Sequence, residues 1–163
     1  MSLPPLKLNI PPLVIFDPPH RFVDTVFLHC SASDNPAHDD VSVIRKWHTT
    51  PPRNWADVGY HYFIKRDGTI QPGRPLEKTP AAQAGHNSGT IAICLHGLEK
   101  SLFSPEQYAS VKALCRAIDD AYRDKRRIRF RGHREVDPHK TCPVFDYQGI
   151  LGLDEHGYIP RLT

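Results

Sequence analysis

Three side chains form a candidate metal-binding set. His29 ends a run of β-branched and aromatic residues, His133 follows a second such run, and Cys142 comes nine residues after His133. Two neutral imidazoles and one thiolate suit zinc in tetrahedral geometry, and three protein ligands leave the fourth position to water, as in catalytic sites. The spacing alone does not decide the matter, because a strand-end surface histidine and a buried thiol explain His29 and Cys142 more simply.

Apolar runs that predict strands lead to these residues. We expect strands over 22–30, 59–65, 69–71, 90–95 and 128–131. The Asp67-Gly68 pair between the second and third runs is a hairpin signal. Cys30, Cys94 and Cys115 lie in apolar runs and are predicted to be small core side chains rather than disulfide partners.

Two helices are predicted between these strands. One begins after Asp39 or Asp40 and runs to about His48. The other begins after Ser104, where Gln107 completes a capping box, and its apolar residues recur at helical spacing. Strands that alternate with helices predict an α/β fold: a single domain with a central mixed β-sheet flanked by helices.

Composition and charge exclude several classes of protein. The net charge of +3, from 21 basic and 18 acidic residues, does not indicate a nucleic-acid-binding protein. No stretch has the length of a membrane-spanning helix, which argues against membrane insertion. The N-terminus has no apolar signal segment or cleavage site, so we expect synthesis in the cytoplasm without a signal peptide.

Four segments, in order along the chain, carry a more specific signal: FLHCSAS, WADVGYHYFIKRDGTI, AGHNSGTIAICLHG and GHREVDPHKTCPVFD. Over roughly residues 24–147 the chain resembles the type-2 N-acetylmuramoyl-L-alanine amidase family, which includes bacteriophage lysozymes and animal peptidoglycan-recognition proteins. The family has a central mixed sheet flanked by helices. The prolines near the N-terminus predict an extended arm over 1–21. The resemblance implies a zinc amidase domain over 22–163.

The resemblance also implies the reaction and its metal. One zinc ion (Zn2+) per chain would be bound by His29, His133 and Cys142, and a cysteine as third ligand is typical of the bacteriophage branch. The substrate would be peptidoglycan, cut at the amide between N-acetylmuramic acid and L-alanine. We therefore expect a phage or prophage endolysin, a monomer that acts on the periplasmic cell wall after release.

Two further positions match the family's catalytic residues. Tyr60 would orient the attacking water, and Lys140 would stabilise the developing oxyanion. Taken without the resemblance, Tyr60 is better explained as a packed strand tyrosine and Lys140 as a solvated loop lysine.

Substrate-binding residues are expected at His86, Asn87 and Trp55. His86 and Asn87 lie in a loop that often lines the substrate groove in the family, but they could equally order that loop. Trp55 could wall the groove or pack in the core. Glu135 and Asp146 are candidates to orient a ligand histidine through a hydrogen bond, although each could be an ordinary loop carboxylate.

The sequence departs from the family in two places. Many relatives carry a histidine a few residues before the Gly-His-Asn turn, where this chain reads AAQA over 81–84. The loop between His133 and Cys142 also carries one extra residue around His139, which leaves the register of Lys140 open by one position and makes His139 an alternative ligand.

Three alternative functions stay open at this point. A non-catalytic peptidoglycan-binding module would typically lack the cysteine ligand, and Cys142 is present. A regulatory amidase that also binds a polymerase would need a surface that the sequence does not reveal. A structural zinc domain would need a fourth ligand, for which His139 is the convenient candidate.

Overall fold

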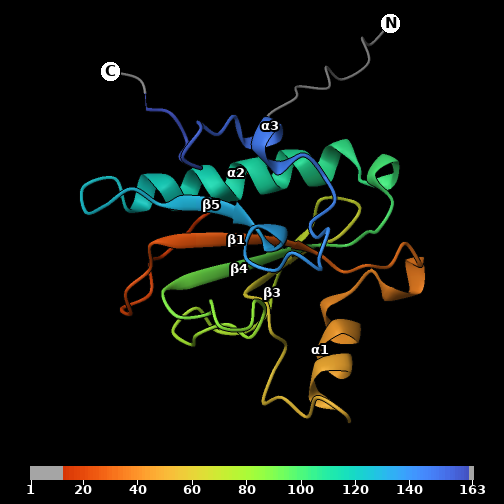
Figure 1. Cartoon of the computed structure of the whole chain (residues 1–163). Helices are drawn as coiled ribbons and strands as arrows, with labels where there is room; N and C mark the ends of the chain where they lie inside the picture. Colours follow the sequence, from red (N-terminus) through yellow and green to blue (C-terminus); the bar gives the residue numbers. More distant parts are fainter. Residues whose placement is uncertain (1–12, 162–163) are drawn as a thin grey trace, which may run out of the picture.

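The computed structural model describes residues 13–161. They fold around one five-stranded mixed sheet (Figure 1). The strands lie in the order β3-β2-β4-β1-β5. β1 pairs in parallel with β4 and β5, β2 pairs in parallel with β4, and β3 is antiparallel to β2. The strands are β1 (Thr25–Cys30), β2 (Tyr62–Ile64), β3 (Ile70–Pro72), β4 (Thr90–Leu95) and β5 (Arg129–Gly132).

Helices begin where the sequence supplies side-chain caps. Asp40, rather than Asp39, caps α1 (Val41–Thr49) by accepting a hydrogen bond from the Ser42 amide. Ser104 and Gln107 form the predicted capping box of α2 (Pro105–Ala121). The remaining helices are short: η1 (Pro36–His38), η2 (Lys100–Leu102), η3 (His133–Glu135) and α3 (Tyr147–Leu151).

The two faces of the sheet carry different layers. The face under α2 holds the larger apolar core, in which Val26 and Ile93 pack against Leu114. Figure 1 shows α2 lying along this face and α1 on the other side of the sheet, where Ile44 packs near Phe63 and Cys94. Because side chains alternate along a strand, the second face also receives His29, whose neighbours Leu28 and Cys30 point into the larger core.

The predicted α/β fold with a central mixed sheet is confirmed, and β1 and β2 are shorter than their apolar runs. β1 begins at Thr25 rather than at residue 22, and Phe22 is exposed. The hairpin of β2 and β3 turns at Asp67-Gly68 as predicted. Cys30, Cys94 and Cys115 are buried as free thiols.

The proline-rich segment is described only from residue 13 onward, so residues 1–12 of the predicted arm lie outside the described residues. Phe16 is buried against Tyr122, the residue that follows α2, whereas Leu13 and Ile15 are exposed. The Arg21 guanidinium donates to the carbonyls of Leu76 and Thr90, at 2.7 and 2.8 Å. These contacts attach residues 16–21 to the sheet domain, and a boundary at residue 21 stays a prediction.

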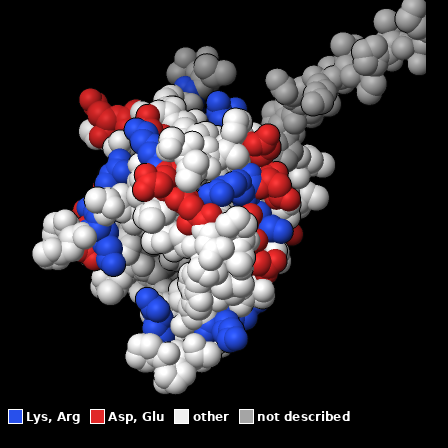
Figure 2. Space-filling model, turned by 90° about the vertical axis from the view of Figure 1, so that its right-hand side faces the viewer, with Lys and Arg blue, Asp and Glu red and all other residues white. Residues whose placement is uncertain are grey.

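The surface carries charges of both signs. Figure 2 shows acidic and basic side chains side by side over much of one face, in keeping with the small net charge. Within residues 13–161, no helix combines the length and apolarity needed to cross a membrane.

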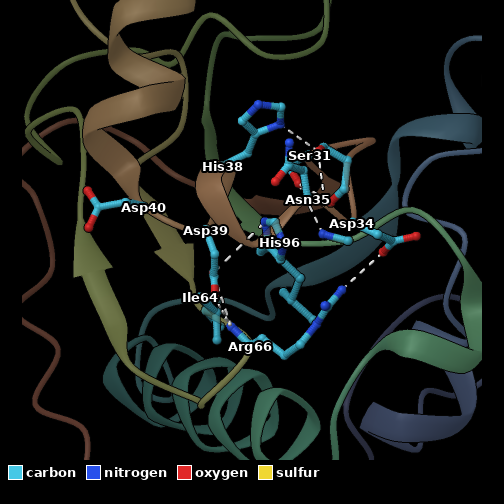
Figure 3. Close-up of polar contacts among 12 residues, drawn as sticks. Ser31, Asp34, Asn35, His38, Asp39, Asp40, Ile64, Arg66 and His96 are labelled. Atoms are coloured by element: carbon cyan, nitrogen blue, oxygen red, sulfur yellow. Dashed lines mark hydrogen bonds and ion pairs between the residues drawn. The ribbon is translucent and has the colours of Figure 1, made fainter.

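A cluster of polar side chains holds the loop between β1 and α1 in place (Figure 3). It consists of Asp34, Asp39, Arg66 and His96, and we call it the His96 cluster. Asp34 accepts hydrogen bonds from the Arg66 guanidinium at 3.1 Å and from the backbone amides of residues 98 and 99. Asp39 accepts from the Arg66 amide and lies 3.9 Å from Nδ1 of the buried His96. The cluster therefore joins this loop to the ends of β2 and β4.

Candidate metal centre

The register of two parallel strands brings His29 and His133 together. Leu28 of β1 pairs with Gly132 of β5. The residues that follow them, His29 and His133, therefore lie at the same level of the sheet. The two imidazole rings lie 4.8 Å apart, centroid to centroid. Residues separated by about a hundred positions in the sequence thus become neighbours through sheet pairing.

Cys142 reaches the same point because its loop folds back onto β5. The Arg134 amide donates to the Cys142 carbonyl at 2.9 Å. Gly132 permits the approach, since a Cβ there would lie 2.6 Å from the Tyr147 ring and 2.9 Å from Pro143. The hydroxyl of Tyr147 also donates to Glu135, which closes the base of the loop.

The ligand atoms of His29, His133 and Cys142 all lie within 4.8 Å of one another. The Cys142 sulfur is 3.7 Å from Nδ1 of His29, and the Cys30 amide donates to this sulfur at 3.2 Å. A backbone N–H directed at sulfur favours a thiolate, which is the form that binds a metal. The structure therefore brings together the three residues that the sequence proposed as ligands.

Burial sets the protonation of this group. It lowers the pKa of His29 to about 3, and the nearby His133 lowers it further in the same direction. Burial also lowers the pKa of His133. Both imidazoles are therefore neutral at pH 7 and have a lone pair for a metal. A hydrogen bond with the Cys30 thiol, together with burial, raises the pKa of Cys142, so its thiolate needs a cation beside it.

A residue that sequence reasoning missed contacts His29 directly. Gln83 is fully buried, and its Oε1 lies 2.8 Å from Nε2 of His29. The only signal in the sequence was the departure over 81–84, where relatives often carry a histidine. Among the described residues, the hydrogen bonds of Glu135 and Asp146 go elsewhere: Glu135 accepts from the Gly132 amide, and Asp146 caps α3.

The three candidate ligands open onto a cavity of about 400 Å³. Tyr60 and Lys140 both line it, as do His139 and Trp55. The Tyr60 ring lies 5.1 Å from that of His29, and burial raises the pKa of its phenol, which keeps it protonated at neutral pH. Lys140 is exposed at the rim, on the loop that carries Cys142.

His48 is a second residue that the sequence did not single out for the site. It lies at the end of α1 and lines the cavity between Trp55 and Tyr60, with ring centroids 4.7 and 5.5 Å away. Its Nδ1 accepts a hydrogen bond from the Gly59 amide at 2.8 Å, so the remaining proton is on Nε2. Burial lowers its pKa to about 4, which keeps the ring neutral. His48 thus offers a neutral donor at the cavity wall.

The structure does not place His86 and Asn87 in the lining of this cavity. His86 is exposed, and the Asn87 side chain accepts hydrogen bonds from the amides of Ala82 and Gln83, both at 3.0 Å. Of the three residues expected to bind substrate, only Trp55 lines the cavity.

The donor set fits a catalytic rather than a structural metal site. Two neutral imidazoles and one cysteine suit zinc, and the cavity leaves one side of the set open. His139 lines the same cavity but is exposed and does not belong to the group of mutually close donors. The fold and the site together define a candidate metal-dependent hydrolase.

Comparisons with known proteins identify the family. The family model described as N-acetylmuramoyl-L-alanine amidase matches residues 19–145. The endolysin of Escherichia phage T7 is 36% identical over 129 residues, covering 76% of this chain and 82% of that protein. The endolysin of Enterobacteria phage K11 is 35% identical over 130 residues, covering 75% and 81%. The chain belongs to the N-acetylmuramoyl-L-alanine amidase family.

Solved structures agree with this assignment. The N-acetylmuramoyl-L-alanine amidase LysC from Clostridium intestinale superposes with a TM-score of 0.69 at 26% identity, covering 80% of this chain and 83% of that one. Drosophila PGRP-LB superposes with a TM-score of 0.61 at 22% identity over 78% of each chain, which shows a shared fold. The predicted resemblance to amidases and peptidoglycan-recognition proteins is confirmed.

Proposed function

We propose that the protein is a zinc-dependent N-acetylmuramoyl-L-alanine amidase that acts as a phage or prophage endolysin. It hydrolyses the amide bond between N-acetylmuramic acid and L-alanine in bacterial peptidoglycan. The observation that carries the proposal is the convergence of His29, His133 and Cys142 at one cavity, in a chain of this family.

His29, His133 and Cys142 would hold one zinc ion, with Nδ1 of His29 directed toward the Cys142 sulfur. When bound, zinc supplies a Lewis acid for the scissile carbonyl and activates water at neutral pH. The protein's own contribution is to keep both imidazoles neutral and to direct an N–H at the sulfur.

Tyr60 and Lys140 are the proposed catalytic side chains. Tyr60 stays protonated, so its hydroxyl can hydrogen-bond the attacking water and hold it toward the carbonyl carbon. Lys140 lies at the rim of the cavity, on the loop that carries Cys142. From there its ammonium can stabilise negative charge on the oxygen of the scissile carbonyl. Trp55, on the wall of the cavity, is the proposed contact for the glycan or stem peptide.

The biological setting follows from the relatives. The proteins from phages T7 and K11 are called endolysins, a name that fits synthesis in the cytoplasm and action on the cell wall after release. We extend this setting to the present chain, and we predict that it acts as a monomer.

Mass spectrometry of purified peptidoglycan fragments, incubated with the protein with and without a zinc chelator, tests the proposal. We expect free stem peptides that begin at alanine, and we expect them only when metal is present. Intact fragments from folded, zinc-loaded protein would overturn the proposal and favour a peptidoglycan-binding module that does not cut. Free peptides that form equally well in the presence of the chelator would overturn the zinc dependence alone.

A further inference from the structure

We propose that Gln83 is a positioning residue for His29: its buried amide sets the tautomer and the ring orientation with which His29 meets the metal. The loop that carries His86 and Asn87, together with Thr90 at the start of β4, would act by holding this amide in place. The inference rests on the proposed function, because it takes His29 to be a metal ligand.

The two nitrogens of His29 face different partners. Nε2 lies 2.8 Å from Oε1 of Gln83, and Nδ1 lies 3.7 Å from the Cys142 sulfur. A neutral imidazole carries one N–H, and an amide oxygen can only accept. The proton therefore belongs on Nε2, which leaves the lone pair of Nδ1 directed at the metal-binding set.

The neighbours of the Gln83 amide favour one orientation. Its Nε2 lies 2.9 Å from the Thr90 hydroxyl and 3.3 Å from the His86 carbonyl oxygen. That hydroxyl donates its own proton to the Asn87 carbonyl at 2.8 Å, so it accepts from Gln83. Exchanging the amide oxygen and nitrogen would set an oxygen against the His86 carbonyl and would require Thr90 to give up its bond to Asn87, so the network favours Oε1 facing His29.

The backbone around Gln83 is held as well. The Asn87 side chain accepts from the Gln83 amide at 3.0 Å, and the Ala81 amide donates to the Gly59 carbonyl at 3.1 Å. A Cβ at Gly59 would lie 2.2 Å from the Ala81 carbonyl oxygen, so only glycine allows this approach. The loop is thus packed against the segment that carries Tyr60, and this packing holds Gln83 beside His29.

This arrangement gives the His86–Asn87 loop a role other than substrate contact. Both residues lie outside the cavity lining, and their backbone carbonyls complete the hydrogen bonds that orient Gln83. A partner on the distal nitrogen of a ligand histidine typically contributes 10- to 100-fold, as an order of magnitude, to metal affinity or activity. We expect Gln83 to contribute within about that range.

The decisive experiment compares the zinc affinity of the wild-type protein with that of two variants, Gln83→Met and Gln107→Met. Methionine keeps the length of the side chain and removes the amide. Gln107 is the matched control: it is also fully buried and bonds the backbone carbonyls of residues 64 and 96, on the other side of the sheet. Competition with a chromogenic chelator gives the dissociation constants, and circular dichroism confirms that each variant is folded.

We expect zinc binding to weaken about 10- to 100-fold in Gln83→Met and to stay within about threefold of wild type in Gln107→Met. Thr90→Val, which removes one acceptor of the Gln83 amide, should weaken zinc binding by a smaller factor. Equal affinities for wild type and Gln83→Met would overturn this inference and leave the proposed function intact. Wild-type protein that binds no zinc would overturn the proposed ligand assignment and this inference with it.

A second measurement does not depend on any variant folding. Long-range proton–nitrogen NMR correlations of histidine rings in the zinc-free wild-type protein report which nitrogen of His29 carries the proton. We expect the proton on Nε2. A proton on Nδ1 would overturn the inference whatever the zinc affinity proves to be.

Discussion

Two buried histidines at the carboxyl ends of neighbouring strands differ in what surrounds their rings. His29 and His96 are 1% and 0% exposed, and burial lowers the pKa of both. Each nitrogen of His29 has a defined neighbour, Gln83 on one side and the Cys142 sulfur on the other. Within residues 13–161, neither nitrogen of His96 has a hydrogen-bond partner, and Asp39 lies 3.9 Å away.

The contrast teaches that burial alone does not make a histidine a candidate for chemistry. Gln83 and Cys142 flank the His29 ring, and the ring faces the cavity, so its lone pair is available to a metal. The His96 cluster instead joins loops through Asp34 and Arg66, as Figure 3 shows, and the His96 ring approaches that network only at Asp39, 3.9 Å away. Substitutions, metal removal and acid should affect the chemical region around His29 and the structural region around His96 differently.

The largest effect is expected from Cys142→Ala. Loss of the thiolate removes one of three proposed zinc ligands, and amidase activity should fall by more than about 10³-fold, since metal catalysis is worth several kcal/mol. The control is Cys115→Ala, which removes a buried thiol on α2 and should leave the specific activity of the folded protein near that of wild type. Turnover of peptidoglycan fragments by both variants checks this, and an active Cys142→Ala protein would remove Cys142 from the site.

Removing the metal should lower the thermal stability of the protein through the His29 site and not through the His96 cluster. A ligand that binds only the folded state at 1,000 times its dissociation constant stabilises it by about 4 kcal/mol. Chelation should therefore lower the midpoint of thermal unfolding, and added zinc should restore it. In the Cys142→Ala variant the midpoint should respond much less to zinc, whereas in an Asp34→Asn variant it should respond as in wild type. An identical zinc response in Cys142→Ala would contradict the assignment.

Acid should destabilise the protein through its buried neutral histidines. Burial lowers the pKa of His61 to about 4, while the unfolded chain has an ordinary value near 6.5. Below about pH 6.5 the unfolded state binds more protons, so this contribution to stability is present above that pH and is lost as pH falls toward 4, by about 3 kcal/mol for a full shift. Urea unfolding at pH 7 and pH 4.5 measures it, and equal free energies of unfolding would contradict the expectation.

The smallest effect is expected from His96→Leu. A buried polar ring without partners costs free energy, so an apolar side chain of similar size should raise the free energy of unfolding by about 1 kcal/mol. Amidase activity should not change, because His96 does not line the cavity. Urea unfolding and turnover assays check both statements. A large loss of stability would show that the His96 ring contributes to its cluster after all.

Much of this molecule was predictable from local sequence. Alternating and apolar runs predicted the five strands, because burial on one or both faces of a sheet leaves a period-two or continuous apolar pattern. Ser104 and Gln107 marked the start of α2, because a capping box is a contact between residues three apart. The set of His29, His133 and Cys142 followed from residue chemistry together with the family resemblance.

Only the tertiary structure decided which residues support that set. Gln83 meets His29 across 54 positions, through the pairing of β1 with β4 and the packing of a loop against Gly59. The same loop turned His86 and Asn87 away from the cavity, and the fold of α1 brought His48 into it. Local sequence determines where strands and caps form, because those preferences act over a few residues. Strand register and loop packing act over long separations, so the partners of a buried ring become visible only when the chain is folded.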